Sequence, residues 1–177
     1  MFIPNIGPMN RLCLLEKTFK GSGYDIAVSL TNKALVFEKG ATPQWQTLDF
    51  NPEYAQDILF IYSGKKRVSS EAIKNFDCSR VSEDSITILN TITDALLKCS
   101  TISEVESLMD AHENLISAII GVKPIKEELF KDYSGSIKSL GAWGGDFFMA
   151  TRKEEAKKYF SNKGYSTMFE WNEIIKQ

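Results

Sequence analysis

The chain contains few of the side chains that build metal centres or disulfide frameworks. Its 177 residues include one histidine and three cysteines, and no Cys-x-x-Cys pair occurs. Cys13, Cys78 and Cys99 lie far apart in the sequence, and only His112 could join them as a ligand. This pattern argues against a zinc site of the usual ligand set. It predicts reduced cysteines that are buried or half-buried.

The sequence also lacks a surplus of positive charge and a long apolar run. Lysine and arginine together number 21 against 23 aspartates and glutamates, which gives a net charge of -2. Such a chain offers no broad positive field to nucleic acid or to anionic lipid. No stretch approaches the roughly 18 to 20 apolar residues that cross a bilayer, and residues 1–9 lack the basic region of a signal peptide. We therefore expect a cytoplasmic protein that binds neither nucleic acid nor membranes.

What the sequence does contain is enough apolar bulk for a folded core. Hydrophobic residues make up 43% of the chain and charged residues 25%, and there are 11 Phe, 6 Tyr and 3 Trp. This composition is typical of a globular protein. At this length the chain can form one domain, or one domain and part of another.

The first part of the chain carries helix and strand signals that stop at a proline. The expected elements are a helix at 10–19 and strands at 26–30, 34–37 and 44–50. Asn51-Pro52 then interrupts the pattern, because proline cannot donate to a strand ladder. We therefore expect a domain boundary at this point, with residues 1–52 in one domain and residues 53–177 in the other.

The rest of the chain alternates strand and helix signals. Residues 58–62 (Ile-Leu-Phe-Ile-Tyr) form a continuous apolar run, as expected of a strand buried on both faces. The further expected elements are helices at 69–76, from Ser82 and from Ser103, strands at 136–140 and 147–150, a helix at 152–162 and a strand at 167–169. This order fits an α+β fold of ferredoxin-like type with an inserted helical hairpin.

The two long helices from Ser82 and Ser103 are expected to form that hairpin, because each has an apolar side. The apolar stripe of the first would consist of Ile86, Leu89, Thr93, Leu96 and Leu97. The second helix would end near Gly121, with His112 on its apolar side.

Residues 21–25 (Gly-Ser-Gly-Tyr-Asp) form the first candidate site. Two glycines free the backbone immediately before Asp25, which leads into the expected strand at 26–30. An aspartate in this position can face a cleft, with Gly23 and Tyr24 beside it. The alternative is that the glycines only make a turn and that Asp25 is a solvated or capping residue.

A glycine-rich segment between two expected strands is the second candidate. It consists of Gly141, Ala142, Trp143, Gly144 and Gly145. Backbone N–H groups in such a loop can bind phosphate oxygens, because no side chain stands in the way. The same residues can also form only a tight hairpin. Trp143 either packs under the loop or closes over the site.

Two weaker candidates lie elsewhere. Lys65, Arg67 and Ser69 follow the apolar run at 58–62 and would suit an anionic group on a substrate, although a charged turn is usually only solvated. His112 either packs as a half-buried residue among apolar neighbours or contacts a substrate.

The two glycine segments occur in the order found in the GHMP kinases, the small-molecule kinase family of galactokinase, homoserine kinase, mevalonate kinase and phosphomevalonate kinase. Residues 21–29 resemble the family segment that carries the catalytic aspartate, and residues 138–146 resemble its third, glycine-rich motif. Residues 63–70 are similar to the strand-to-helix turn of mevalonate kinases, and residues 108–114 to a helix of the same domain. The sequence Gly-Tyr-Asp-Ile-Ala at residues 23–27 is similar to a motif of one bacterial subgroup of these kinases, which is named for that motif.

The resemblance implies both a fold and a reaction. The fold would be the carboxy-terminal domain of a GHMP kinase, preceded by the last strands of the amino-terminal domain. The reaction would transfer the γ-phosphoryl group of ATP, with Mg²⁺, to the hydroxyl of a small molecule such as mevalonate or a related isoprenoid precursor. Asp25 would be catalytic, accepting the hydroxyl proton or orienting the hydroxyl, and the loop from Gly141 to Gly145 would bind phosphate. The residues that could bind the acceptor are Gly23, Tyr24, Lys65, Arg67, Ser69 and His112.

Two departures from the family pattern keep a second hypothesis open. The family's first two motifs, the second of which is the main ATP phosphate loop, have no counterpart before Lys20, and Trp143 stands where a glycine is usual. The family's Mg²⁺ ligands lie mainly in that missing part, so no residue here is predicted to bind metal. We therefore expect a fragment, or a chain begun at an internal methionine. The alternative to a kinase is a truncated, non-catalytic binding or interaction module of the same fold.

Overall fold

The computed structural model describes residues 23–40, 42–64, 76–141, 143 and 145–175. These residues form two compact units, one made of the residues up to Asn51 together with Ile175, the other running from Pro52 to Ile174. The helices expected at 10–19 and 69–76 lie outside the described residues.

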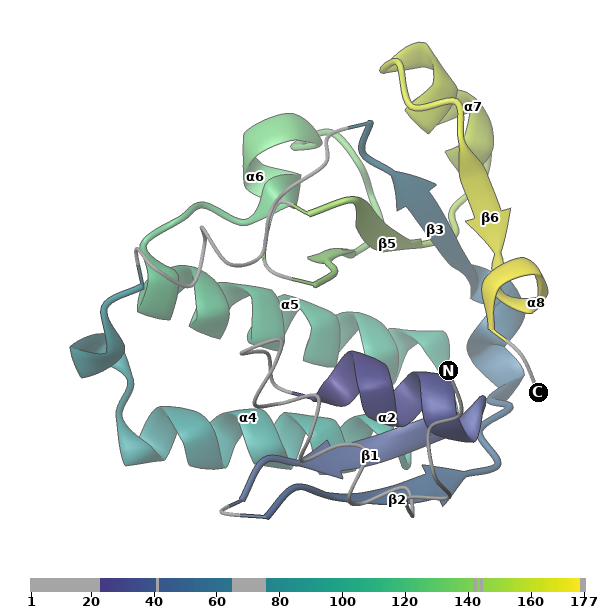
Figure 1. Ribbon diagram of the computed structural model, residues 1–177. Coiled ribbons are helices and arrows are strands. Elements are labelled where there is room, and N and C mark those ends of the chain that lie inside the picture. Colours follow the sequence, from purple (N-terminus) through teal and green to yellow (C-terminus); the bar gives the residue numbers. More distant parts are fainter. Residues whose placement is uncertain (1–22, 41, 65–75, 142, 144, 176–177) are drawn as a thin grey trace, which may run out of the picture. The chain divides into compact units, whose positions relative to one another are not determined.

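The first unit contains a helix and a two-stranded antiparallel sheet (Figure 1). Helix α2 covers Tyr24–Thr31, strand β1 covers Ala34–Glu38 and strand β2 covers Gln44–Leu48. The strands pair so that Val36 lies opposite Gln46. The two strands expected in this region are therefore confirmed, although the second is shorter than expected.

The strand expected at 26–30 is wrong, because these residues belong to α2. Gly23 precedes the helix with a φ of 84°, and Asn32 ends it with a φ of 52° while its N–H donates to the Val28 carbonyl at 2.8 Å. Glycine and asparagine adopt this left-handed conformation more readily than other residues do. The two end signals outweigh the β preference of the apolar run, which depends strongly on context.

The second unit is built on a four-stranded antiparallel sheet of order β4-β5-β3-β6 (Figure 1). The strands are β3 (Ile58–Tyr62), β4 (Ile137–Ser139), β5 (Phe147–Thr151) and β6 (Met168–Glu170). One row of side chains across the sheet consists of Lys138, Met149, Phe60 and Phe169. Strand β3 is central and its residues from Ile58 to Ile61 are buried, which confirms the strand expected to be covered on both faces.

The second unit contains five described helices, and the two long ones begin at recognisable capping residues. The five helices are α4 (Glu83–Leu96), α5 (Ile102–Ile120), α6 (Ile125–Leu129), α7 (Ala156–Asn162) and α8 (Trp171–Ile174), with 3-10 turns at Glu53–Asp57 and Cys78–Arg80. The Ser82 hydroxyl accepts the Ser85 N–H at 3.1 Å, Thr101 and Glu104 form a capping box, and Gly121 ends α5 with a φ of 72°. Helices α4 and α5 run side by side (Figure 1), so the expected helical hairpin is present.

The buried side of α4 differs from the stripe expected from the sequence. Ile92 is buried, whereas Ile86 and Leu97 are 48% and 36% exposed. Leu89 and Leu96, at spacings of three and four residues from Ile92, are partly buried. The sequence contains isoleucines on more than one side of this helix, and contact with α5 selects which of them is covered.

A cluster of buried apolar and aromatic residues packs on the sheet. It consists of Leu59, Ile61, Phe130, Tyr133, Ile137, Phe148, Ala150, Ala156 and Phe160. The rings of Phe130, Phe148 and Phe160 meet one another at centroid distances of 5.2 to 5.8 Å. Such ring pairs add to the gain from burial. The cluster therefore fixes β4 and β5 against the segment that follows α6.

The end of β5 is held by a close backbone approach at Gly135. A β-carbon at this position would lie 2.6 Å from the Thr151 hydroxyl oxygen, 2.8 Å from the Thr151 carbonyl oxygen and 2.9 Å from the Tyr133 ring. The Tyr133 hydroxyl donates to that carbonyl at 2.6 Å, and the Ser136 N–H donates to the Thr151 hydroxyl at 2.9 Å. Only glycine fits here without moving these partners.

We predict that Gly135→Ala lowers the free energy of unfolding by about 1–3 kcal/mol, because the added methyl group overlaps a backbone oxygen that cannot rotate away. Urea denaturation followed by circular dichroism measures the change. Ser134→Ala is the matched control, since Ser134 is exposed and its loss should cost no more than about 0.5 kcal/mol. Equal midpoints for the two variants would contradict the close approach.

Candidate functional site

In the first unit, Asp25 lies in the first turn of α2 and is exposed. The buried Gly23 precedes it, and the Gly23 carbonyl accepts the Ala27 N–H at 3.0 Å. A carboxylate at a helix N-terminus is stabilised by the partial positive charge of the free N–H groups. The Tyr24 ring meets the Phe37 ring edge to face at 6.0 Å. Asp25 therefore lies at the start of a helix, which corrects the expectation that it leads into a strand.

In the second unit, the glycine-rich segment joins β4 to β5. Gly141 has a φ of 67° and Trp143 a φ of 34°. The Leu140 N–H donates to the Phe147 carbonyl at 3.1 Å, which closes the hairpin at its base. Trp143 is buried, and a left-handed φ is costly for a residue with a bulky side chain. Of the five predicted phosphate-binding residues, Ala142 and Gly144 lie outside the described residues.

The end of β3 is tied to this loop. The Ser63 N–H donates to the Asp146 carbonyl at 2.7 Å, and the Ser63 hydroxyl donates to the Gly145 carbonyl at 2.9 Å. The chain then turns at Gly64, which has a φ of 72°. The end of β3 thus meets the end of the glycine-rich loop. Lys65, Arg67 and Ser69, which follow this turn, lie outside the described residues.

Near the base of the loop, α5 and β4 enclose a group of ionisable side chains. Glu113 is 2% exposed, and its Oε1 lies 3.7 Å from the Nζ of Lys138. The Lys138 ammonium also donates to the Ser139 carbonyl at 3.3 Å. Burial raises the pKa of Glu113 and lowers the pKa of Lys138, while each group's charge opposes the shift of the other. Burial, with a smaller effect of Lys138, lowers the pKa of His112 to about 4, so its imidazole is neutral at pH 7.

The sequence-based search selected His112 and missed Glu113. The spacing of α5 nevertheless contains a signal for it, because Glu113 follows the buried Val105 and Met109 at intervals of four residues. A carboxylate on the buried side of a helix is rare unless it has a partner or a role. That partner, Lys138, comes from a strand far away in the sequence, and the helix pattern holds no information about it.

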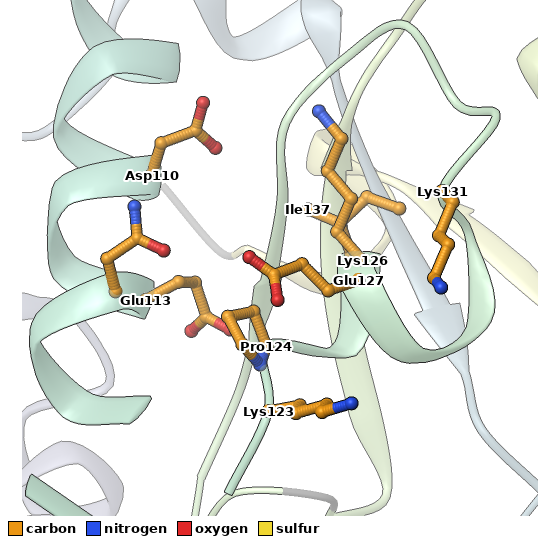
Figure 2. A pocket seen from close by; sticks show the side chains of 9 residues that line it. Asp110, Glu113, Lys123, Pro124, Lys126, Glu127, Lys131 and Ile137 are labelled. Atoms are coloured by element: carbon orange, nitrogen blue, oxygen red, sulfur yellow. The ribbon is translucent and has the colours of Figure 1, made fainter. Parts of the chain in front are cut away.

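A pocket of about 480 Å³ lies beside these residues, between α5, α6 and β4 (Figure 2). It is lined by Asp110, Glu113, Asn114, Lys123, Pro124, Lys126, Glu127, Lys131 and Ile137. Figure 2 shows the side chains of Glu113 and Glu127 extending into the space between the two helices. None of the described residues predicted to bind phosphate or acceptor lines this pocket.

The described part of the chain has neither a metal-binding cluster nor a membrane-spanning helix. No group of three or more histidine, cysteine, aspartate or glutamate side chains is arranged there to hold a metal ion. Within the same residues, no helix combines the length and the apolar character that crossing a membrane requires.

Two solved structures are similar to this chain. One is Streptococcus pneumoniae phosphomevalonate kinase in complex with phosphomevalonate and AMPPNP, with a TM-score of 0.69, 14% identity, and coverage of 91% of this chain and 59% of that one. The other is a structure of phosphomevalonate kinase from the same organism, with a TM-score of 0.62, 14% identity, and coverage of 91% and 60%. This chain has the fold of the part of phosphomevalonate kinase that it matches.

The phosphomevalonate kinase fold confirms the fold expected from the glycine segments, because that enzyme is one of the GHMP kinases whose motifs they resemble. At 14% identity the likeness shows the fold alone. The chain spans about 60% of the length of these structures. No family model and no curated protein matches the sequence.

We predict that His112 stays neutral well below pH 6 in the folded protein, because its burial beside Lys138 opposes protonation. Since His112 is the one histidine of the chain, its imidazole proton signals can be followed by NMR without assignment. Its folded pKa of about 4 lies below the usual value of about 6.5. Protonation therefore favours the unfolded chain, and stability should decline as the pH falls from about 6.5 toward 4. A signal that titrates near pH 6.5 would contradict the burial of this ring.

Proposed function

We propose that this chain takes part in transfer of the γ-phosphoryl group of ATP to the hydroxyl group of a small molecule, with mevalonate or a related isoprenoid precursor as the acceptor. The observation that carries the proposal is the β4–β5 loop. Its backbone turns at Gly141 with a φ of 67° and its far end is tied to β3 through Ser63. The loop belongs to a chain with the fold of an enzyme solved with phosphomevalonate and AMPPNP. A shared fold alone does not establish a shared reaction, so the proposal needs the loop geometry as well.

In this proposal Asp25 is the catalytic residue. The acceptor oxygen attacks the γ-phosphorus, the bond from that phosphorus to the β–γ bridging oxygen breaks, and ADP leaves with that oxygen. The hydroxyl proton passes to the Asp25 carboxylate, or the carboxylate orients the hydroxyl. The exposed position of Asp25 at the start of α2 supports this role, because a substrate can reach it.

The loop from Gly141 to Gly145 would hold the phosphates through its backbone N–H groups. The resemblance assigns acceptor binding to Gly23, Tyr24, Lys65, Arg67, Ser69 and His112. Because His112 has a pKa of about 4, it would act at pH 7 as a neutral hydrogen-bonding group. Any positive charge for an anionic acceptor would then come from Lys65 and Arg67.

Mg²⁺ would accompany ATP and neutralise charge on its phosphates. The described residues include no group of three carboxylate or histidine side chains for this ion. The resemblance puts the ligands of this ion mainly in the family motifs that have no counterpart here, so we assign no residue of this chain as its ligand. In the same proposal, residues 1–52 belong to an amino-terminal domain and residues 53–177 form the carboxy-terminal domain.

We predict that the chain binds Mg²⁺-ATP and that Gly141→Ala weakens this binding about tenfold. A β-carbon at Gly141 meets no atom within 4 Å, so the substitution acts through the φ of 67°. The strained residue would turn the loop N–H groups away from the phosphates, and a loss of 1.4 kcal/mol is tenfold in affinity. Isothermal titration calorimetry with Mg²⁺-ATP measures the affinity of each protein.

Gly164→Ala is the matched control. Gly164 also has a positive φ, 92°, and open space around its β-carbon position, but it follows α7 and lies outside the loop. Both variants should lose similar stability, and only Gly141→Ala should lose affinity. Equal affinities in the two variants would refute the assignment of the loop. No binding by the unmodified chain would favour the non-catalytic binding or interaction module of the same fold.

We predict that Asp25→Asn lowers kcat about 10²- to 10⁴-fold, because proton transfer from the acceptor hydroxyl loses its base. The affinity for ATP should change little, since the carboxylate acts on the acceptor. A coupled assay for ADP with mevalonate and with phosphomevalonate as acceptors measures turnover.

Asp84→Asn is the control for this substitution. Asp84 is also an exposed aspartate in the first turn of a helix, α4, so it removes the same charge from the same kind of position. Turnover should be unaffected. Unchanged turnover in Asp25→Asn would exclude Asp25 as the catalytic residue.

A further inference from the structure

Strand β4 is an edge strand whose outer side faces α5 and α6. It pairs with β5 alone. The Thr151 N–H donates to the Ser136 carbonyl and the Leu140 N–H donates to the Phe147 carbonyl. The backbone N–H and carbonyl groups of the even-numbered residues from 136 to 140 therefore point toward β5. In an antiparallel ladder the residues between them point their backbone groups the other way. The N–H and carbonyl of Ser139 therefore point to the outer edge of the sheet, two residues before Gly141.

The outer edge at Ser139 is occupied by the ion pair of Glu113 and Lys138. The Lys138 ammonium donates to the Ser139 carbonyl at 3.3 Å and lies 3.7 Å from the Glu113 carboxylate. Burial raises the pKa of the Glu113 carboxyl, and Lys138 and then Ser139 act in the opposite direction. Both residues of the pair thus act on the same short piece of backbone.

The Glu113 carboxylate is held at the edge of β4 by weak contacts with Lys138 and Ser139. Neither of its oxygens has a hydrogen bond of good geometry, and Ser139 and Lys138 act on it only as weaker donors, although the residue is 2% exposed. Helix α5 sends a second carboxylate, Glu106, toward the sheet, and that one accepts the Thr151 hydroxyl at 2.5 Å and lies 2.7 Å from the Lys153 Nζ. A buried carboxylate with incomplete hydrogen bonding is costly. An apolar side chain at position 113 would therefore serve stability at least as well.

We propose that Glu113 is a positioning residue for the phosphate-binding loop. With Lys138 as its counter-ion it fixes the edge of β4 at Ser139 and so sets the direction in which the loop leaves the strand at Gly141. The hydrogen bonds of Ser63 fix the other end of the loop at Gly145 and Asp146. The proposal rests on the proposed function in one respect only, that the loop binds the phosphates of a nucleotide.

The test uses the full chain and the variant Glu113→Gln, which keeps the shape of the side chain and removes its charge. Hydrogen–deuterium exchange of the amides from 138 to 147 reports the order of the loop. Calorimetry with Mg²⁺-AMPPNP reports affinity. We expect faster exchange confined to this segment and an affinity reduced about 10- to 100-fold, because the loss of one hydrogen bond to a charged phosphate has an effect of this size.

Asp110→Asn is the matched control. Asp110 lies on the same helix and lines the same pocket as Glu113, but it is exposed. Its substitution should change neither the exchange of the loop amides nor the affinity for AMPPNP. An equal change in both variants would mean that any loss of charge near the pocket has this effect, and it would overturn the proposal.

A double variant separates positioning from stability. In Glu113→Gln with Lys138→Met no charge is left without a counter-ion, so the melting temperature should recover relative to Glu113→Gln. Hydrogen exchange in the loop should stay fast and the affinity for AMPPNP should stay low, because the contact between the Glu113 carboxylate and Ser139 is still missing. If Glu113→Gln does not fold, the double variant carries the same two measurements.

The outcomes of these measurements are distinct. Unchanged loop exchange in Glu113→Gln, or wild-type affinity in the double variant, would overturn the positioning role. Absence of AMPPNP binding by the unmodified chain would overturn the proposed function. In that case the exchange data still decide whether Glu113 orders the loop.

Discussion

The pairing of β5 with β3 on one side and β4 on the other determines where the second unit presents its glycine-rich loop. Residues 58–61 of β3 are buried, and exposing them would cost about 1.5–3 kcal/mol for each side chain. Tyr62 lies opposite Phe147 at the end of the ladder, which brings Ser63 to Gly145 and Asp146. A slip of one residue would turn every side chain of β5 to the other face. The position of the loop therefore follows from the register of the sheet.

Helix α5 carries two carboxylates, Glu106 and Glu113, toward this sheet, and the two differ in how well their charge is paired. Glu106 lies at the end of β5 opposite the loop, where a hydroxyl and an ammonium satisfy it. Glu113 lies near the base of the loop with a counter-ion at 3.7 Å and incomplete hydrogen bonding. The first arrangement joins the helix to the strand at modest cost. An apolar contact often serves stability as well as such a buried pair does, so the position of Glu113 beside a candidate phosphate loop favours a requirement other than stability.

Much of the fold could be predicted because its signals are local. The apolar run of β3, the glycine that ends α5 and the serine that begins α4 each act within a few residues, through burial or through capping of free backbone groups. Prediction failed where local signals disagreed. Residues 26–30 have the composition of a strand, but they form a helix, with Gly23 before its first residue and Asn32 after its last. In α4, isoleucines occur on several sides, and only packing against α5 decides that Ile92 is the buried one.

The sequence by itself determined the classes of most elements after Thr31, the two glycine segments and the candidate residues within them, because backbone freedom and side-chain chemistry are properties of single residues and their neighbours. Only the tertiary structure decided that Ser63 ties the loop to β3, that Trp143 is buried, and that Glu113 meets Lys138 at the edge of β4. Each of these depends on segments far apart in the chain. A charged residue on a helix is solvated by default. It becomes a buried, costly group only when a strand from elsewhere in the sequence covers it.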